Sequence, residues 1–172
     1  INAQRDILPE RAYSPWADME EQLRGNNIPL FSLESKKALI DFDILGFTLP
    51  YETLYTNVLN ILNLAQIPLH AKERGLDYPL IVAGGHATYN PEPIAKFFDA
   101  FLLGEGEEII LDVIAEFQQW RKSQTGKDDL LECLSKISGV YVPSLYSPIY
   151  QDDGTIMGME YANSQVPRQV TK

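Results

Sequence analysis

Residues 79–108 have the sequence PLIVAGGHATYNPEPIAKFFDAFLLGEGEE, and they contain two short apolar runs that each stop at glycine. Leu80 to Ala83 is followed by Gly84-Gly85, and Phe98 to Leu103 is followed by Gly104-Glu105-Gly106. Apolar runs of this length bounded by glycine are typical of buried strands in a parallel sheet. Open α/β sheets bind ligands at the carboxyl ends of their strands, and glycine lets a ligand come close to the backbone. We therefore expect both glycine turns to border one ligand-binding rim.

The composition restricts the class of protein. Of 172 residues, 45% are hydrophobic, and no apolar stretch approaches the roughly 18 residues of a membrane span. Lys and Arg number 14 against 24 for Asp and Glu, which gives a formal net charge of -10. An acidic chain without a basic cluster repels phosphate backbones. We expect neither a nucleic acid nor a membrane as partner, and the absence of a visible secretion signal indicates a cytoplasmic protein.

Cys133 is the only cysteine, so the chain forms no intrachain disulfide. A single thiol also cannot supply a multi-cysteine metal or iron-sulfur site. Its setting, DDLLECLSKI, has the apolar spacing of a helix and favours a buried structural thiol over a reactive one. We predict no metal site and no catalytic residue in this chain.

Strand and helix patterns alternate along the rest of the chain. Ile44 to Leu49 indicates a buried strand that ends at Pro50, and Thr53 is expected to cap a helix through about Leu64. Another helix is expected from Gly106 to about Lys122. Near the N-terminus we expect a strand at 11–14 and then a helix that Asp18 caps, with Glu21, and that Gly25 ends. The packing face of this helix is expected to contain Trp16, Met19 and Leu23. The remaining expected elements are helices at about 91–97 and 130–137, a strand at 140–142, and a hairpin around Asp152-Asp153-Gly154.

This order predicts a doubly wound α/β fold, Rossmann-like or flavodoxin-like, with a mostly parallel sheet and a C-terminal β-hairpin appendage. We expect the α/β domain at 1–138, the hairpin extension at 139–162 and a linker at 163–172. Such sheets normally have a central first strand, and none of the strands found here fits that position. We therefore expect the chain to be a fragment whose first strand lies upstream of Ile1.

The segments GGHATYNPEP and FFDAFLLGEGEE resemble the N-terminal cobalamin (B12)-binding-like domain of radical SAM proteins. In that family a strand ending in two glycines, a His-x-Thr element, a Pro-Glu and an acidic Gly-Glu-Gly-Glu turn occur in this order. The segments ERAYSPWADMEEQL, PLFSLES and FDILGFTLPYETLYTNVLNIL are similar to the subgroup in which this domain precedes the radical SAM barrel. The resemblance covers roughly Glu10 to Tyr161.

The resemblance implies an accessory domain that binds a cofactor or gates substrate, within a parent protein that is a radical SAM enzyme. The CxxxCxxC motif is absent here, so a 4Fe-4S cluster and S-adenosylmethionine are implied only for a missing downstream domain. The Asp-x-His-x-x-Gly element that supplies the lower cobalt ligand in many cobalamin domains is also absent. Cobalamin is the implied cofactor, without axial histidine ligation, and the downstream barrel of the same chain is the implied partner.

Eight residues are candidates for cofactor contact. By the resemblance, Thr48 matches a small hydroxyl residue after a strand, and Gly84 and Gly85 match the glycine pair beside the nucleotide tail. His86 could touch a corrin edge or ligate a metal, although a hydrogen bond that stabilises its loop is favoured, whereas His70 is expected to be a surface or packing histidine. Tyr51 could stack on a flat ligand, but a tyrosine near a helix start is more often packed in the core. The acidic turn adds Gly104, Glu105 and Gly106.

Two alternatives remain open at this point. The Glu105 carboxylate could face a ligand hydroxyl, or it could simply favour the positive end of the helix dipole. The whole domain could bind no corrin and act as a docking module for the barrel or another protein. An open sheet edge could also pair two copies into a homodimer. A small nucleotide-binding enzyme is disfavoured, because GGHATYN lacks the lysine of a phosphate loop.

Overall fold

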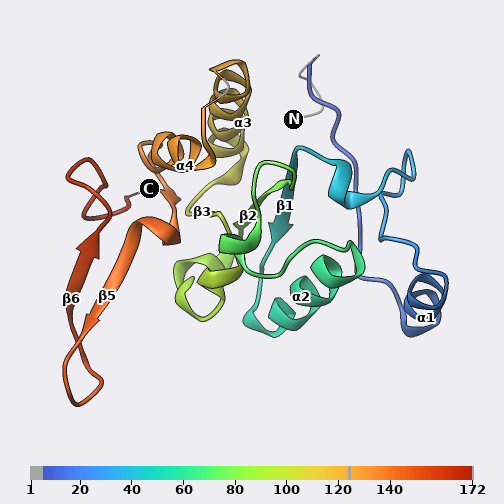
Figure 1. Ribbon diagram of the computed structural model, residues 1–172, viewed down its shortest axis with the longest axis horizontal. Coiled ribbons are helices and arrows are strands. Elements are labelled where there is room, and N and C mark those ends of the chain that lie inside the picture. The colour runs from blue at the N-terminus through green and yellow to red at the C-terminus, as the bar shows by residue number, and fades with distance from the viewer. Residues whose placement is uncertain (1–5, 124, 172) are drawn as a thin grey trace.

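The computed structural model describes residues 6–123 and 125–171, which form a four-stranded sheet and a separate two-stranded hairpin (Figure 1). The sheet has the order β1-β2-β3-β4, in which the first three strands are parallel and β4 is antiparallel to β3. Its strands are β1 (Ile44–Thr48), β2 (Leu80–Gly84), β3 (Ala100–Leu102) and β4 (Val140–Tyr141), and the hairpin is β5 (Tyr146–Tyr150) with β6 (Ile156–Tyr161).

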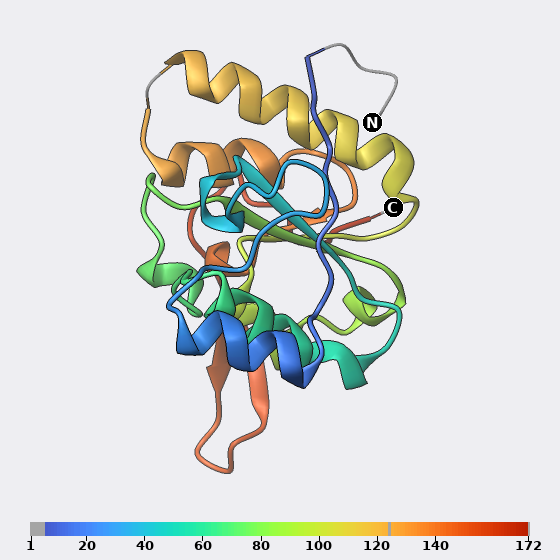
Figure 2. The ribbon, with the colours of Figure 1, turned by 90° about the vertical axis from the view of Figure 1, so that its right-hand side faces the viewer.

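Helices cover both faces of the sheet (Figure 2). On one face lie α1 (Ala17–Gly25) and α2 (Tyr55–Leu64), and on the other lie α3 (Gly106–Ser123) and α4 (Lys127–Ser135). Short 3₁₀ turns connect several elements, including the turns at His86–Tyr89 and Glu92–Phe97 after β2. The expected α/β class and mostly parallel sheet are therefore confirmed. Among the helices described, none is both long and apolar enough to cross a membrane.

The alternation of side chains along β2 divides the core into two layers. Ile81 and Ala83 pack with Val58 and Leu62 of α2, while Val82 points to the α3 and α4 side. All four apolar residues of this strand from Leu80 to Ala83 are buried, as expected for a central parallel strand covered on both faces. Full burial of one such aliphatic side chain contributes about 1.5–3 kcal/mol, so the two layers together fix the strand in place.

Several predicted elements at the N-terminal side differ from the structure. Residues 11–14 form no strand. The Arg11 carbonyl accepts from the Leu33 amide, but the Arg11 amide donates to the side chain of Glu34 and not to a neighbouring strand. Helix α1 begins at Ala17 with no side-chain cap, so the predicted Asp18 cap is wrong. Its start also exposes Trp16, which was expected to pack. Only Leu23 of that expected face is buried.

Other boundaries shift for similar local reasons. A 3₁₀ turn at Glu52–Leu54 precedes α2, so Thr53 does not cap that helix as predicted. The strand at Ile44–Thr48 is present, but it lies at the edge of the sheet, where Gly46 and Thr48 are exposed. The expectation that this strand is buried is therefore wrong. Its place at the edge follows from strand order, which its own composition does not reveal.

The hairpin around Gly154 is confirmed, and it extends away from the sheet (Figure 1). Gly154 has a φ of 83°, and the Gln151 amide donates to the Thr155 carbonyl at 2.8 Å. After the hairpin, the chain packs against the domain: Val166 is buried and the Tyr146 hydroxyl donates to the Pro167 carbonyl at 2.8 Å. The described part of the 163–172 segment thus contacts the domain.

Candidate functional site

The carboxyl ends of the three parallel strands meet at one rim. Thr48 at the end of β1 is in register with Gly84 at the end of β2, and Gly84 is in turn in register with Leu102 of β3. Thr48 is exposed and Gly84 is partly exposed. The sequence therefore placed the two glycine turns correctly at adjacent strand ends.

Gly85 is required by the packing of the chain against itself. Its φ is 110°, and a Cβ atom built there would lie 2.7 Å from the Leu49 carbonyl oxygen and 2.9 Å from the Leu49 carbonyl carbon. Leu49 is also bonded on both sides, since its amide donates to the Gly84 carbonyl at 2.7 Å and its carbonyl accepts from the Ala87 amide at 2.9 Å. The space that we expected Gly85 to leave for a ligand is thus taken by the backbone of Leu49.

Thr88 connects the turn after β2 to the end of β3 through its hydroxyl, and it was not among the predicted site residues. Its hydroxyl is at 2.6 Å from the Gly85 carbonyl and at 3.3 Å from the Leu102 carbonyl. The side chain is almost fully buried. A hydroxyl three residues after a glycine turn is a local signal for such a bond, and the His-x-Thr element of the sequence contained it.

A groove beside β1 includes three of the eight candidate residues. It has a volume of about 910 Å³, and Thr48, Gly84 and Gly106 are among its lining residues. A Cβ at Gly106 would meet no atom within 4 Å, and one at Gly84 would be only in ordinary contact with Leu102. The other candidates are not among the residues that line this groove: Tyr51, Gly85, His86, Gly104 and Glu105.

Those other candidates lie on the loops around the rim. Tyr51 and His86 are exposed, and Gly104 has a φ of 113°, which a side chain would strain. Glu105 is exposed before α3. His70 stacks on Phe97 with ring centroids 5.1 Å apart, as expected for a packing histidine.

The turn that follows the rim is held to β4 by a hydrogen bond. The Tyr141 hydroxyl donates to a carboxylate oxygen of Glu92, in the turn at Glu92–Phe97. Burial is the largest cause that raises the pKa of Tyr141, and the nearby Glu92 carboxylate is the next largest. The Tyr141 hydroxyl therefore remains a donor at neutral pH. The contact ties β4 to the segment between β2 and β3.

The amino ends of the strands are held by a buried cluster of charged side chains that sequence reasoning missed. Asp99, directly before β3, accepts hydrogen bonds from Arg74 at 3.1 Å and from the Ile81 amide at 2.8 Å, and it forms an ion pair with Lys127 at 2.9 Å. The side chains of Arg74 and Asp99 are 0% and 1% exposed. Asp99 interrupts the apolar run FFDAF, and a carboxylate in a run expected to be buried signals that a partner must be present.

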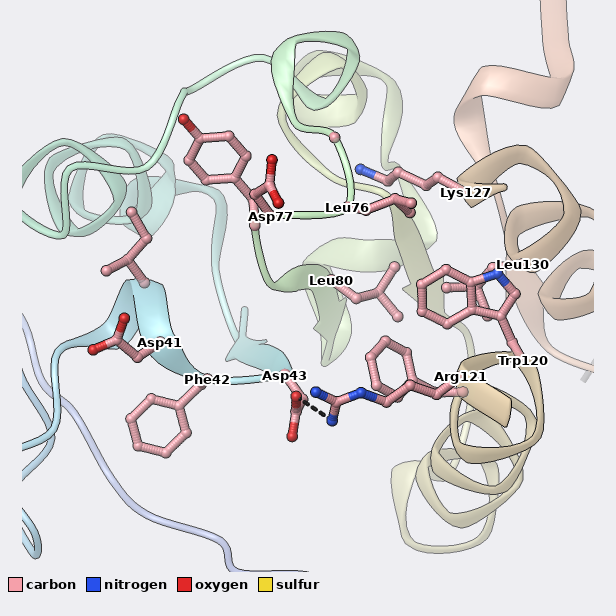
Figure 3. A pocket seen from close by; sticks show the side chains of 14 residues that line it. Asp41, Phe42, Asp43, Leu76, Asp77, Leu80, Trp120, Arg121, Lys127 and Leu130 are labelled. Carbon is pink, nitrogen blue, oxygen red and sulfur yellow. Dashed lines mark ion pairs between the residues drawn. The ribbon is translucent and has the colours of Figure 1, made fainter. Parts of the chain in front are cut away.

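A smaller pocket lies at this same end of the sheet (Figure 3). Its volume is about 320 Å³, and it lies between the starts of β1 and β2 and the helices α3 and α4. Figure 3 shows Asp43 directed at Arg121, with an N···O distance of 2.6 Å. Both side chains are more than half exposed, so this is a surface ion pair. Asp43 therefore acts in a surface contact.

The described residues offer no metal centre. Within residues 6–123 and 125–171 there is no group of three or more His, Cys, Asp or Glu side chains that could hold a metal ion. Cys133 is partly buried. Burial is the largest cause that raises the pKa of its thiol, and the neighbouring Glu116 carboxylate is the next largest. A single protonated thiol does not fit an iron-sulfur cluster, which needs several thiolates.

The fold and the rim define an α/β domain whose parallel strands end at a glycine-rich edge. Residues 1–143 match the family model described as radical SAM proteins, N-terminal, and the chain belongs to this family. An uncharacterized protein of Methanocaldococcus jannaschii is 34% identical over 96 residues, which cover 53% of this chain and 20% of that protein. The match thus spans about a fifth of the relative's length. No solved structure matches the chain.

Proposed function

We propose that this chain is a cobalamin-binding accessory domain of a radical SAM enzyme, Rossmann-like in fold and without catalysis of its own. The observation that carries the proposal is the pair Thr48 and Gly84, which lie side by side at the carboxyl ends of two parallel strands and line a groove of about 910 Å³. Open α/β sheets bind ligands at this position. The 4Fe-4S cluster and S-adenosylmethionine then belong to another domain of the parent protein.

The residues at the rim fit a cofactor tail better than they fit a metal. Gly84 and Gly106 leave space that a side chain would reduce, and the Thr48 hydroxyl can bond to a polar group placed between them. His86, Tyr51, Gly104 and Glu105 surround this place on exposed loops, while Gly85 acts indirectly by fixing Leu49. Cobalamin, when bound, supplies a cobalt centre that carries alkyl groups.

The test is the visible absorbance of the protein peak after gel filtration with excess hydroxocobalamin. We expect Gly84→Val to lose the corrin chromophore while remaining folded, because its Cβ meets only ordinary contacts. Gly158→Val is the matched control, since a Cβ on this β6 glycine meets no atom within 4 Å. Equal corrin retention by both variants would contradict the proposal. Gly85→Val is unsuitable, because it disturbs the fold itself.

A second candidate function is docking without a corrin, and the exposed hairpin favours it. Tyr150, Ile156 and Met157 are 60–64% exposed on strands that extend away from the sheet. Apolar side chains exposed together commonly mark a protein interface. The partner in this case is the radical SAM barrel of the same polypeptide, in the cytoplasm.

Docking is tested with the separately expressed barrel. We expect Ile156→Asp to weaken association by at least about tenfold, whereas Asp152→Asn at the hairpin tip should change it little. If the wild-type chain binds neither corrin nor the barrel, both candidates are wrong. Corrin binding by the wild-type chain combined with loss of that binding in Gly84→Val favours the first.

A further inference from the structure

The β5–β6 hairpin has two outer edges, and the ladder between its strands decides which backbone groups they expose. At its base the Ala162 amide donates to the Leu145 carbonyl at 2.9 Å, so these two residues form a hydrogen-bonded pair. Bonded and non-bonded pairs alternate along an antiparallel ladder. By this alternation Pro148 and Met159, which are in register further along, form a non-bonded pair. The backbone groups of such a pair point away from the partner strand, toward the outer edges.

A proline blocks one of these edges, and the other is open. Pro148 has no N–H group, so the outer edge of β5 lacks a donor in its middle, a common protection of strand edges. On β6 the same alternation turns the N–H and C=O groups of Met159 and Tyr161 outward. Among the described residues β6 pairs with β5 and with no other strand. Figure 1 shows β6 on the side of the hairpin that faces away from the sheet.

A β-bulge sets the length of the open edge. The register between the strands skips Met157, which makes this residue the extra one on β6. A bulge interrupts a regular ladder, so an added strand can follow only the residues after it, 158–161. The open edge therefore suits a short extended segment.

The side chains along this edge alternate between apolar and acidic. Met159 and Tyr161 point to one face of the hairpin, and Glu160 points to the other. Met159 is 37% exposed, and Glu160 is also exposed. A strand next to β6 would place side chains of one face beside Met159 and Tyr161 and a side chain of its other face opposite Glu160.

The charge of the hairpin indicates which segment fits this edge. Residues 137–167 contain Asp152, Asp153 and Glu160 and no lysine or arginine. Opposite charges on facing strands attract, whereas like charges directly opposite each other are unfavourable. A second copy of the hairpin would bring the same acidic residues, so charge disfavours the pairing of two copies. The edge is therefore complementary to a basic strand.

We propose that the outer edge of β6 binds an extended segment of the docking partner in which apolar residues alternate with lysine or arginine. The segment adds an antiparallel strand that bonds to the backbone of Met159 and Tyr161. Glu160 is then at a non-bonded position, where facing side chains come closest, and a basic residue lies opposite it. The inference rests on the docking function proposed above and names its surface and the chemistry of its partner. It is independent of corrin binding.

The test uses the 172-residue chain and a short peptide that alternates valine and lysine. We expect the peptide to shift the amide NMR signals of Met159 and Tyr161 and, at saturation, to slow the exchange of both amides at least about tenfold. The Glu160 amide points to β5 and is the internal control. A peptide that alternates valine and glutamate should not bind, because it places an acid opposite Glu160.

Two variants of one residue separate backbone pairing from side-chain contact. Met159→Pro removes an outward N–H but no bond within the hairpin, and we expect it to weaken binding of the valine-lysine peptide at least about tenfold. Met159→Ala is the matched control, because it keeps the N–H, and it should weaken binding by less than about threefold. Unchanged protection of the Gly158 amide shows that the hairpin persists in both variants. A larger loss in Met159→Ala than in Met159→Pro would overturn strand addition.

A charge reversal tests the same edge without a proline. Glu160→Lys should reverse the preference, so that the valine-glutamate peptide binds at least about tenfold more tightly than the valine-lysine peptide. An unchanged preference would overturn the proposal, as would binding of neither peptide by the wild-type chain. Protection of the Met159 amide without peptide, together with a dimeric mass in light scattering, would also overturn it, because a second copy would then occupy the edge.

Failure of this proposal is distinguishable from failure of the docking function. Association with the barrel that Ile156→Asp weakens and Met159→Pro leaves unchanged would overturn strand addition alone. Binding of the valine-lysine peptide without association with the barrel would support the site on β6 and reject the barrel as its partner.

Discussion

The two ends of the parallel sheet are held together by different interactions. At the amino ends, Asp99 joins Arg74 and Lys127 in a buried cluster of charges. At the carboxyl ends, Gly85 packs on Leu49 and backbone bonds complete the contact. One end therefore depends on charge neutralisation, and the other depends on a glycine and on backbone geometry. The carboxyl ends of the strands, which are proposed to bind a ligand, therefore lack the buried ion pairs of the amino ends.

The largest expected effect is at the charged end. Asp99→Asn should lower the free energy of unfolding by about 3–5 kcal/mol, because it leaves the buried Arg74 guanidinium without a countercharge. Urea unfolding at neutral pH measures it. Asp77→Asn is the control, since Asp77 is exposed at the same end. A loss below about 1 kcal/mol for Asp99→Asn would show that the cluster does not hold this end.

The glycine end should respond to a single methyl group. Gly85→Ala is expected to cost at least about 1–3 kcal/mol, because its backbone has a positive φ and the new Cβ would contact Leu49 at 2.7 Å. Gly84→Ala is the matched control and should change stability by less than about 1 kcal/mol, since its Cβ has only ordinary contacts. Thermal unfolding compares the two. Similar losses would remove the distinction between these adjacent glycines.

A smaller effect is expected from the Thr88 hydroxyl, which connects the turn after β2 to the end of β3. Thr88→Val keeps the side-chain shape and removes the donor to the Gly85 carbonyl, which should cost about 0.5–1.5 kcal/mol. Thr53→Val, on the exposed turn before α2, serves as a control for the change in residue type. Unfolding by urea measures both. An unchanged stability for Thr88→Val would mean that backbone contacts alone hold the rim.

The smallest effect is expected at the exposed ion pair beside the buried cluster. Arg121→Gln removes the contact with Asp43, but both side chains are well exposed. Exposed pairs of this kind contribute about 0–1 kcal/mol, so we expect a change within about 0.5 kcal/mol that decreases further at high salt. A loss above about 1.5 kcal/mol, independent of salt, would mean that charge at this end acts beyond the buried cluster.

The sequence predicted those features that depend on neighbouring residues. The apolar run at 80–83 and its glycine stop became β2, and the helix expected from Gly106 to about Lys122 became α3. These signals are local, because periodicity and turn residues act over a few positions. The hairpin around Gly154 was found for the same reason.

Features that depend on distant residues were missed. Asp99 and Arg74 lie 25 positions apart, and nothing local to either residue names the other as its partner. Gly85 was interpreted as space for a ligand because its contact with Leu49 forms only once β1 and β2 are paired. The edge position of β1 was also hidden, because strand order is a property of the whole sheet. The glycine turns were consequently placed at the correct strand ends, but the different roles of Gly84 and Gly85 were not separated.

The exposed hairpin has a consequence for oxidation. The chain has three methionines, of which Met157 and Met159 lie on β6 and Met19 lies on α1. All three are at least 37% exposed, so none contributes a fully buried thioether to the core. Conversion of these side chains to sulfoxides therefore adds polarity at the surface and leaves the two core layers intact. Mild peroxide treatment should mark the hairpin chemically while the domain stays folded.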